Sequence, residues 1–156
     1  MKAFRVLSAL LVFALLLCGC MKRSRPPERE KNLSSTYVFS EVSYLSPLSS
    51  STWEYRQAVM SGTIYTITAD TFSWQNRRES RSISVLQYVK EPASQEARNL
   101  LGVRELEQYT LYAEGGPAYL RLYIAGEKVW VSSYIIAPGN GEDLFSYIYL
   151  LEKVET

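Results

Sequence analysis

The chain has 156 residues, of which 47% are hydrophobic and 21% are charged, and its formal net charge is +1. This length and composition fit one globular domain with a buried core, and they exclude a disordered chain, a collagen and a coiled coil. The near-neutral charge gives no basis for nucleic-acid binding. The chain contains no histidine, which excludes a Ser–His or Cys–His catalytic pair within it.

The first 20 residues have the organisation of a secretory signal. Lys2 and Arg5 form a short positive region, and residues 6–17 are apolar apart from Ser8. This run is shorter than the roughly 20 residues that a transmembrane helix needs, but it has the length of the apolar region of a signal peptide. A buried core helix or an uncleaved anchor is the alternative, although a core helix would be amphipathic or capped.

The apolar run ends in Leu17-Cys18-Gly19-Cys20, which resembles the lipobox of bacterial lipoproteins. The resemblance implies that residues 1–19 are a lipoprotein signal peptide, cut after Gly19, and that Cys20 is acylated. It places the chain on the cell membrane or the outer membrane through its lipid, with the domain outside the cytoplasm. Two or three acyl chains anchor stably where one does not. No cysteine follows Cys20, so the mature chain has no material for a disulfide or a thiolate metal site.

Residues 20–32 are expected to be a lipidated amino terminus and a charged tether. Residues 22–31 carry five basic and two acidic side chains and include Pro26-Pro27. A Pro-Pro pair favours an extended chain, and mixed charge keeps it solvated. The segment is therefore predicted to be a spacer that holds the domain off the bilayer, or a basic patch that touches anionic headgroups.

Residues 33–156 are predicted to form one β-rich domain, because apolar and polar residues alternate and β-branched and aromatic residues are abundant. Short turns such as Gly115-Gly116 separate the runs, and residues 75–82 are expected to form a loop. The predicted strands are residues 36–45, 52–60, 63–69, 72–74, 82–90, 105–113, 118–125, 129–137 and 144–154, with a further turn at Pro138-Gly139-Asn140-Gly141.

One helix is predicted over residues 93–101, with Pro92 in its first turn and Gly102 at its end. Eight or nine consecutive strands with short connections are typical of an antiparallel up-and-down barrel or sandwich. The fold class is therefore mainly β with one short helix.

Three segments of this domain resemble small lipocalin-like barrels found among bacterial lipoproteins. They are the early Thr52-Trp53 pair, the Tyr123-Ile124-Ala125-Gly126 hairpin and the final Tyr149-Leu150-Leu151-Glu152-Lys153 strand. The resemblance implies a small barrel. Ser51 stands where the lipocalin first-strand pattern has glycine two residues before its tryptophan.

Aromatic residues are the candidates for ligand binding. Trp53, Tyr55, Trp74, Tyr123 and Trp130 fall in predicted strands, where they could stack on sugars, enclose an apolar ligand or simply fill the core. In the last strand Tyr147 and Tyr149 lie on one face and Leu144, Ile148 and Leu150 on the other. We therefore expect one of these two apolar faces to meet a helix, a partner or a ligand rather than water.

Motifs for catalysis are missing from the sequence. It has no glycine-rich phosphate loop and no nucleophile elbow. Glu105 and Glu107 share a strand face and are the material for a carboxylate-based hydrolase, although a solvated outer face is the simpler reading. Arg77, Arg78 and Arg81 crowd one loop, which is either solvated or binds an anionic headgroup or polysaccharide. We expect no metal, no cofactor and no enzymatic activity.

The main expectation is a non-catalytic lipoprotein that binds a small apolar ligand or an envelope component. The alternative is a structural or assembly lipoprotein whose apolar face docks an envelope protein.

Overall fold

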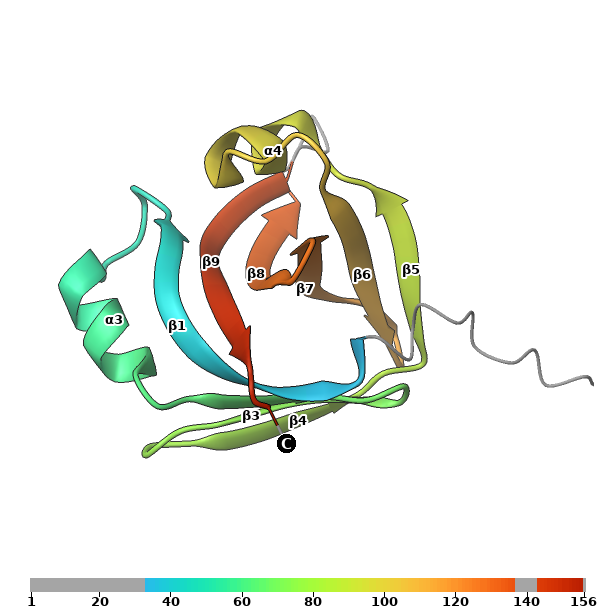
Figure 1. Cartoon of the computed structure of the whole chain (residues 1–156), viewed down its shortest axis with the longest axis horizontal. Helices are drawn as coiled ribbons and strands as arrows, with labels where there is room; N and C mark the ends of the chain where they lie inside the picture. The colour runs from blue at the N-terminus through green and yellow to red at the C-terminus, as the bar shows by residue number, and fades with distance from the viewer. Residues whose placement is uncertain (1–32, 137–142, 156) are drawn as a thin grey trace, which may run out of the picture.

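The computed structural model of the chain describes residues 33–136 and 143–155. Within them nine antiparallel strands form one sheet that curls into a half-barrel, accompanied by the helices α3 (Trp53–Met60) and α4 (Gln95–Leu101) (Figure 1). This confirms the mainly β class and the predicted number of strands. The strands are β1 (Ser35–Leu45), β2 (Ile64–Ile67), β3 (Thr71–Gln75), β4 (Ser80–Ser84), β5 (Gln87–Pro92), β6 (Glu107–Ala113), β7 (Gly116–Ala125), β8 (Lys128–Ile136) and β9 (Asp143–Lys153).

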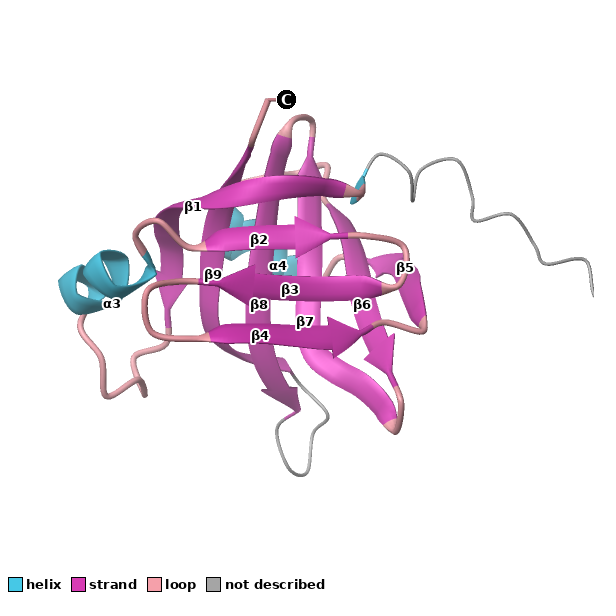
Figure 2. Ribbon diagram, turned by 90° about the horizontal axis from the view of Figure 1, so that it is seen from below, coloured by secondary structure: helices cyan, strands magenta, loops and turns pink. Residues whose placement is uncertain are grey.

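The sheet has the order β4-β3-β2-β1-β9-β8-β7-β6-β5. Strands that follow one another in the chain are therefore neighbours in the sheet, apart from β4 and β5, which do not pair. In addition, the first strand pairs with the last. Figure 2 shows β1–β4, called the front wall below, running across β6–β9. Strands β5–β9 are called the back wall. The two walls enclose the interior of the half-barrel.

The open edges of the sheet meet at one corner, where the chain passes from β4 to β5. The amide of Val85 donates to the carbonyl of Asp70 at 2.8 Å, and the amide of Leu86 donates to the carbonyl of Tyr112 at 2.8 Å. The side chain of Val85 is 4% exposed and that of Leu86 is 72% exposed. The prediction of one strand over residues 82–90 is wrong, because these two residues leave one wall and enter the other.

Helix α3 replaces the strand that the sequence pattern predicted over residues 52–60. Thr52 caps the helix, since its Oγ1 accepts a hydrogen bond from the amide of Tyr55 at 3.3 Å, and Glu54 lies in the first turn. A polar Ncap hydroxyl of this kind stabilises a helix start. Only Met60 of this helix is buried. Because only one of its eight residues is buried, α3 has no apolar stripe at helical spacing. The alternation of apolar and polar residues therefore did not distinguish a helix from a strand.

Gln57 fastens α3 to an irregular part of β1. Its Oε1 accepts from the amide of Val42 at 2.9 Å, and its Nε2 donates to the carbonyl of Ser40 at 3.0 Å. The pairing of β1 with β2 ends at Val38 and Ile64, and α3 lies on the side of β1 away from β9 (Figure 1). Beyond Val38 this side of β1 therefore has no strand partner, and the side-chain amide of Gln57 supplies partners for two of its backbone groups.

Helix α4 confirms the predicted helix and its end. Gly102 has a φ of 66°, a left-handed conformation in which glycine carries no Cβ penalty. The helix starts later than predicted because Ser94 is its cap, accepting from the amide of Ala97 at 3.1 Å. Pro92 belongs instead to the end of β5.

Two apolar clusters lie on opposite sides of the back wall. One fills the interior and includes Tyr37, Phe72, Leu111, Leu122 and Leu151. The other lies on the outer side, under α4, and its buried members are Ala97, Tyr123, Trp130, Tyr134, Phe145 and Ile148. The expectation that one apolar face of the last strand meets a helix is thus confirmed.

Several expectations concern residues outside the described ranges. These are the signal peptide (1–19), the lipidated terminus and tether (20–32), and the Pro138-Gly139-Asn140-Gly141 turn. Of the segments that resemble lipocalin-like barrels, Thr52 and Trp53 lie at the start of α3 rather than in the first strand, whereas the other two lie in β7 with its following turn and in β9.

Candidate functional site

An open pocket of about 1200 Å³ lies at one end of the half-barrel. It is bounded by β5 and β6 on one side, by the turn between β7 and β8, and by the ends of β1 and β9. Its apolar lining includes Leu33, Tyr37, Tyr109, Ile124, Val129 and Leu151. These six belong to the interior cluster or pack against it, so this part of the pocket is continuous with the apolar interior. Leu106, Ala125 and Leu150 also line the pocket and pack against the outer cluster.

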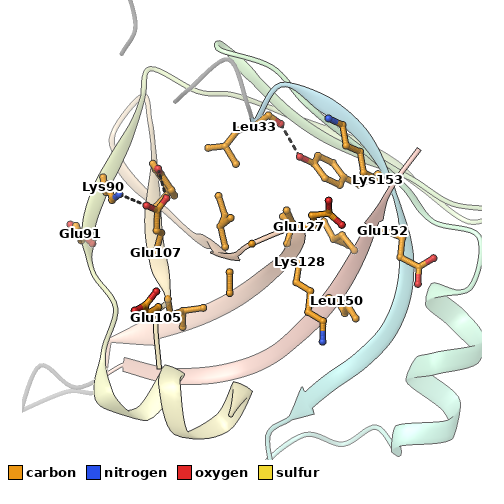
Figure 3. Close-up of a pocket in the computed structure, with 18 of the residues that line it drawn as sticks. Leu33, Lys90, Glu91, Glu105, Glu107, Glu127, Lys128, Leu150, Glu152 and Lys153 are labelled. Carbon is orange, nitrogen blue, oxygen red and sulfur yellow. Dashed lines mark hydrogen bonds and ion pairs between the residues drawn. The ribbon is translucent and has the colours of Figure 1, made fainter. Parts of the chain in front are cut away.

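Charged side chains surround this pocket (Figure 3). Six glutamates and three lysines line it, so its local charge is negative. Lys90 donates to Glu107 at 2.6 Å, and the hydroxyl of Tyr109 donates to the other oxygen of Glu107 at 3.1 Å. This pair is partly exposed, and exposed ion pairs contribute little to stability. Its effect is to hold two side chains in place at the pocket edge.

Tyr37 ties the start of the described chain to the pocket wall. Its hydroxyl donates to the carbonyl of Leu33 at 3.2 Å (Figure 3). Burial raises the pKa of Tyr37 above its ordinary value, so the hydroxyl stays protonated and remains a donor at neutral pH. Leu33 is thereby fixed beside the pocket opening.

A second group of buried tyrosines lies deeper in the interior, toward α3. Tyr147 and Tyr149 stack with ring centroids 4.2 Å apart. Burial is the largest cause that raises the pKa of Tyr65, Tyr147 and Tyr149, and the guanidinium of Arg56 partly opposes the rise in the last two. These groups remain neutral at physiological pH, so they offer hydrogen bonds and apolar surface rather than acid–base chemistry.

The structure does not bring the five predicted aromatic residues together. Trp53 and Tyr55 are half exposed on α3. Trp74 packs against the interior cluster, and its indole donates to Glu79 at 3.4 Å. Tyr123 and Trp130 lie in the outer cluster under α4. None of the five lines the pocket.

The pocket residues carried no recognisable pattern in the sequence. Lys90 and Glu107 are 17 positions apart and meet only because β5 and β6 pair. Leu33 and Tyr37 resemble any apolar pair at the start of a strand. Only the curvature of the sheet brings them to one opening.

The carboxylates proposed for a hydrolase do not form an isolated pair. Glu105 lines the pocket, while Glu107 is paired with Lys90. Asp70 accepts from the hydroxyls of Thr68 and Thr71, which lower its pKa. Glu107 and Asp70 are thus each held by neighbouring side chains.

The described residues contain no group of three acidic or cysteine side chains placed to hold a metal ion. Among the same residues, no helix is both long and apolar enough to cross a bilayer. Cys20 lies outside the described ranges.

Comparison with known proteins found no match: no family model fits the chain, and no curated protein and no solved structure is significantly similar to it. The pocket and the sequence motifs therefore carry the functional argument.

Proposed function

We propose that this protein is a lipid-anchored lipoprotein of the bacterial envelope whose half-barrel binds a small apolar ligand without catalysis. Two independent features support the proposal. The Leu17-Cys18-Gly19-Cys20 motif follows a positive region and an apolar run, and an open pocket leads into an apolar interior.

The pocket is the main evidence for ligand binding. Sites for small ligands are mostly apolar concavities of about 300–1,000 Å³, and about 1200 Å³ leaves room for one such ligand with some water. The inner lining of Tyr37, Tyr109, Val129 and Leu151 provides apolar contact, and the charged rim remains in water. A ligand with an apolar body fits this arrangement better than a fully polar one.

Binding is tested with the neutral apolar dye N-phenyl-1-naphthylamine, whose fluorescence rises in an apolar site. Ile124→Trp fills part of the pocket and is expected to weaken dye binding at least about tenfold, equivalent to 1.4 kcal/mol. Ile64→Trp is the matched control, because Ile64 is exposed on β2 and does not line the pocket. Equal dye binding by both variants would show that the pocket is not the site.

The anchor is tested separately by labelling expressing cells with radioactive palmitate. The unmodified chain is expected to incorporate label, and Cys20→Ser is expected to abolish incorporation. Label that persists in Cys20→Ser would exclude Cys20 as the acylated residue.

Docking of an envelope protein is the second candidate function. The outer edges of β4 and β5 pair with no other described strand, and an open edge can accept a strand from a partner. Native mass spectrometry of the protein extracted in mild detergent separates the two functions. A co-purifying small apolar molecule supports ligand carriage, and a stable complex with another protein supports docking.

A further inference from the structure

Helix α3 and the turn between β3 and β4 form a surface far from the pocket. Tyr55, which is 52% exposed, lines the side of α3 that faces this turn, and Trp53, which is 45% exposed, begins the same helix. Arg77 and Arg78 in the neighbouring turn complete it. These four residues, Trp53, Tyr55, Arg77 and Arg78, are called the α3 surface below.

The two arginines face α3 across a small crevice of about 350 Å³, lined by Tyr55, Ala58, Val59, Ser61, Arg77 and Arg78. Arg78 donates to the hydroxyl of Tyr55 at 3.4 Å. The turn that presents the arginines is fixed, since Oδ1 of Asn76 accepts from the amides of Arg78 and Glu79 at 2.8 and 2.9 Å.

The surface keeps a net positive charge, although Glu54 is exposed between Trp53 and Tyr55. Glu79 is the acidic residue of the turn, and it pairs with Arg81 at 3.0 Å while also accepting from Trp74. Among the described residues, neither Arg77 nor Arg78 takes part in a salt bridge. The structure thus divides the three arginines of this loop into one that is paired and two that are available to an external anion.

We propose that the α3 surface docks on an anionic lipid bilayer. Arginine guanidinium groups bind phosphate in a bidentate manner, so Arg77 and Arg78 contact lipid headgroups. Tryptophan and tyrosine favour the headgroup level of a membrane, where one end of the side chain is apolar and the other is wet. Tyr55, whose hydroxyl accepts from Arg78, occupies that level, and Trp53 lies two positions earlier on the same helix.

This contact is separate from the amino-terminal end of the domain. The chain enters β1 at Ser35 and reaches α3 only after Leu45, and a strand of this length spans about 36 Å. Figure 2 shows α3 beside the far end of β1, away from the start of that strand. Docking of the α3 surface therefore does not depend on acylation of Cys20, nor on the ligand pocket.

The test is a measurement of how close Trp53 lies to the bilayer. Residues 6–17 are apolar, so the full chain is expected to attach to any vesicle, and the readout must be local. The chain is added to vesicles of brominated phosphatidylcholine, alone or mixed with phosphatidylglycerol, and quenching of tryptophan fluorescence is recorded. The part of the quenching that Trp53→Phe removes reports on the α3 surface.

We expect that part to be larger in the anionic vesicles and to fall as salt is added. The double variant R77Q/R78Q is expected to weaken docking about 30-fold, since each basic residue contributes roughly fivefold near an anionic surface. The double variant R98Q/R104Q removes the same charge beside α4 and is expected to dock normally.

Three outcomes would overturn the proposal. One is equal Trp53 quenching in neutral and anionic vesicles. Another is equal docking by R77Q/R78Q and R98Q/R104Q. The third is loss of the Trp53 quenching when millimolar glycerol 3-phosphate is added, which would show that the crevice takes a soluble phosphate ester rather than a membrane surface.

Discussion

The back wall and the front wall of the half-barrel differ in how many of their faces bury apolar side chains. Strands β7–β9 are apolar on both faces: Leu122 and Leu151 point into the interior cluster, while Tyr123 and Ile148 lie in the cluster under α4. Strands β2–β4 are apolar on one face only. Phe72 is buried in the interior, and its neighbour Ser73 is partly exposed.

This difference explains why α4 lies on the outer side of the back wall. A strand buried on both faces loses regular alternation, and a strand with one wet face keeps it. The outer apolar face of the back wall needs a cover, and α4 supplies it through Ala97, with Leu100 and Leu101 packed beside it. The outer faces of β2–β4 are polar apart from the exposed Ile64 and have no such cover. The following predictions test this contrast, from the largest expected effect to the smallest.

Trp130→Ala should produce the largest loss of stability. Trp130 is 4% exposed on the outer face of β8, and its indole donates to Ser43 at 3.2 Å. Its truncation is expected to lower the free energy of unfolding by about 3–5 kcal/mol, measured by urea denaturation. Trp53→Ala, at an exposed tryptophan, is expected to cost less than about 1 kcal/mol. Similar losses for the two variants would mean that α4 does not bury the outer face.

Alkaline pH should destabilise the interior face selectively. Burial raises the pKa of Tyr65 and Tyr149 above the ordinary value of 10. Below pH 10 both are neutral in the folded and the unfolded chain; above it the unfolded chain loses their protons first, so stability falls as pH rises. The double variant Y65F/Y149F is expected to move alkaline unfolding, followed by circular dichroism, to higher pH. Tyr55→Phe, at an exposed tyrosine, should leave it unchanged, and an equal response of the two variants would contradict the assignment.

Gln57→Leu should weaken the attachment of α3 to β1. It leaves the amide of Val42 and the carbonyl of Ser40 without the amide partner they have now, at an expected cost of about 1–3 kcal/mol. Gln95→Leu is the control, because the side chain of Gln95 makes only exposed hydrogen bonds on α4. If chemical denaturation showed that Gln57→Leu lowers the free energy of unfolding by less than about 0.5 kcal/mol, water would be replacing the hydrogen bonds of Gln57.

The two helix caps should differ because they lie at different distances from the buried residues of their helices. Ser94→Ala removes the hydroxyl that accepts from the amide of the buried Ala97 and is expected to cost about 1 kcal/mol. Thr52→Ala removes the equivalent bond to Tyr55 but is expected to cost less in global unfolding, since the first turn of α3 can fray while Val59 and Met60, at its other end, stay packed in the interior cluster. Hydrogen exchange of the two helices measures the difference, and a larger global cost for Thr52→Ala would reverse the contrast.

Lys90→Met should have the smallest effect. The Lys90–Glu107 pair at 2.6 Å is partly exposed, so its loss is expected to cost at most about 1 kcal/mol and to vanish in high salt. Thermal unfolding at two salt concentrations measures it. A larger, salt-independent loss would show that the pair supports the pocket wall itself.

Particular residues show how far sequence reasoning reached in the fold. Alternation predicted β1, the glycine pair predicted the hairpin at Gly115-Gly116, and runs rich in β-branched and aromatic residues predicted the last three strands. Such patterns depend only on neighbours in the chain. The same alternation gave a wrong strand over residues 52–60, where the Thr52 cap was the better indicator. It also merged β4 with β5, since the step at Val85 and Leu86 is a change of wall rather than a change of composition.

For the site, the sequence by itself determined which charged and aromatic residues are present, but not where they lie in the fold. It identified Trp53, Trp130 and the loop arginines without showing that one tryptophan is exposed, that the other is covered by α4, or that Arg81 is paired. Only the tertiary structure decided these points, because strand pairing joins residues that are far apart in the chain. The pocket was likewise beyond a reading of the sequence: Leu33, Lys90 and Leu151 meet at one opening only because the sheet curls until its first and last strands pair.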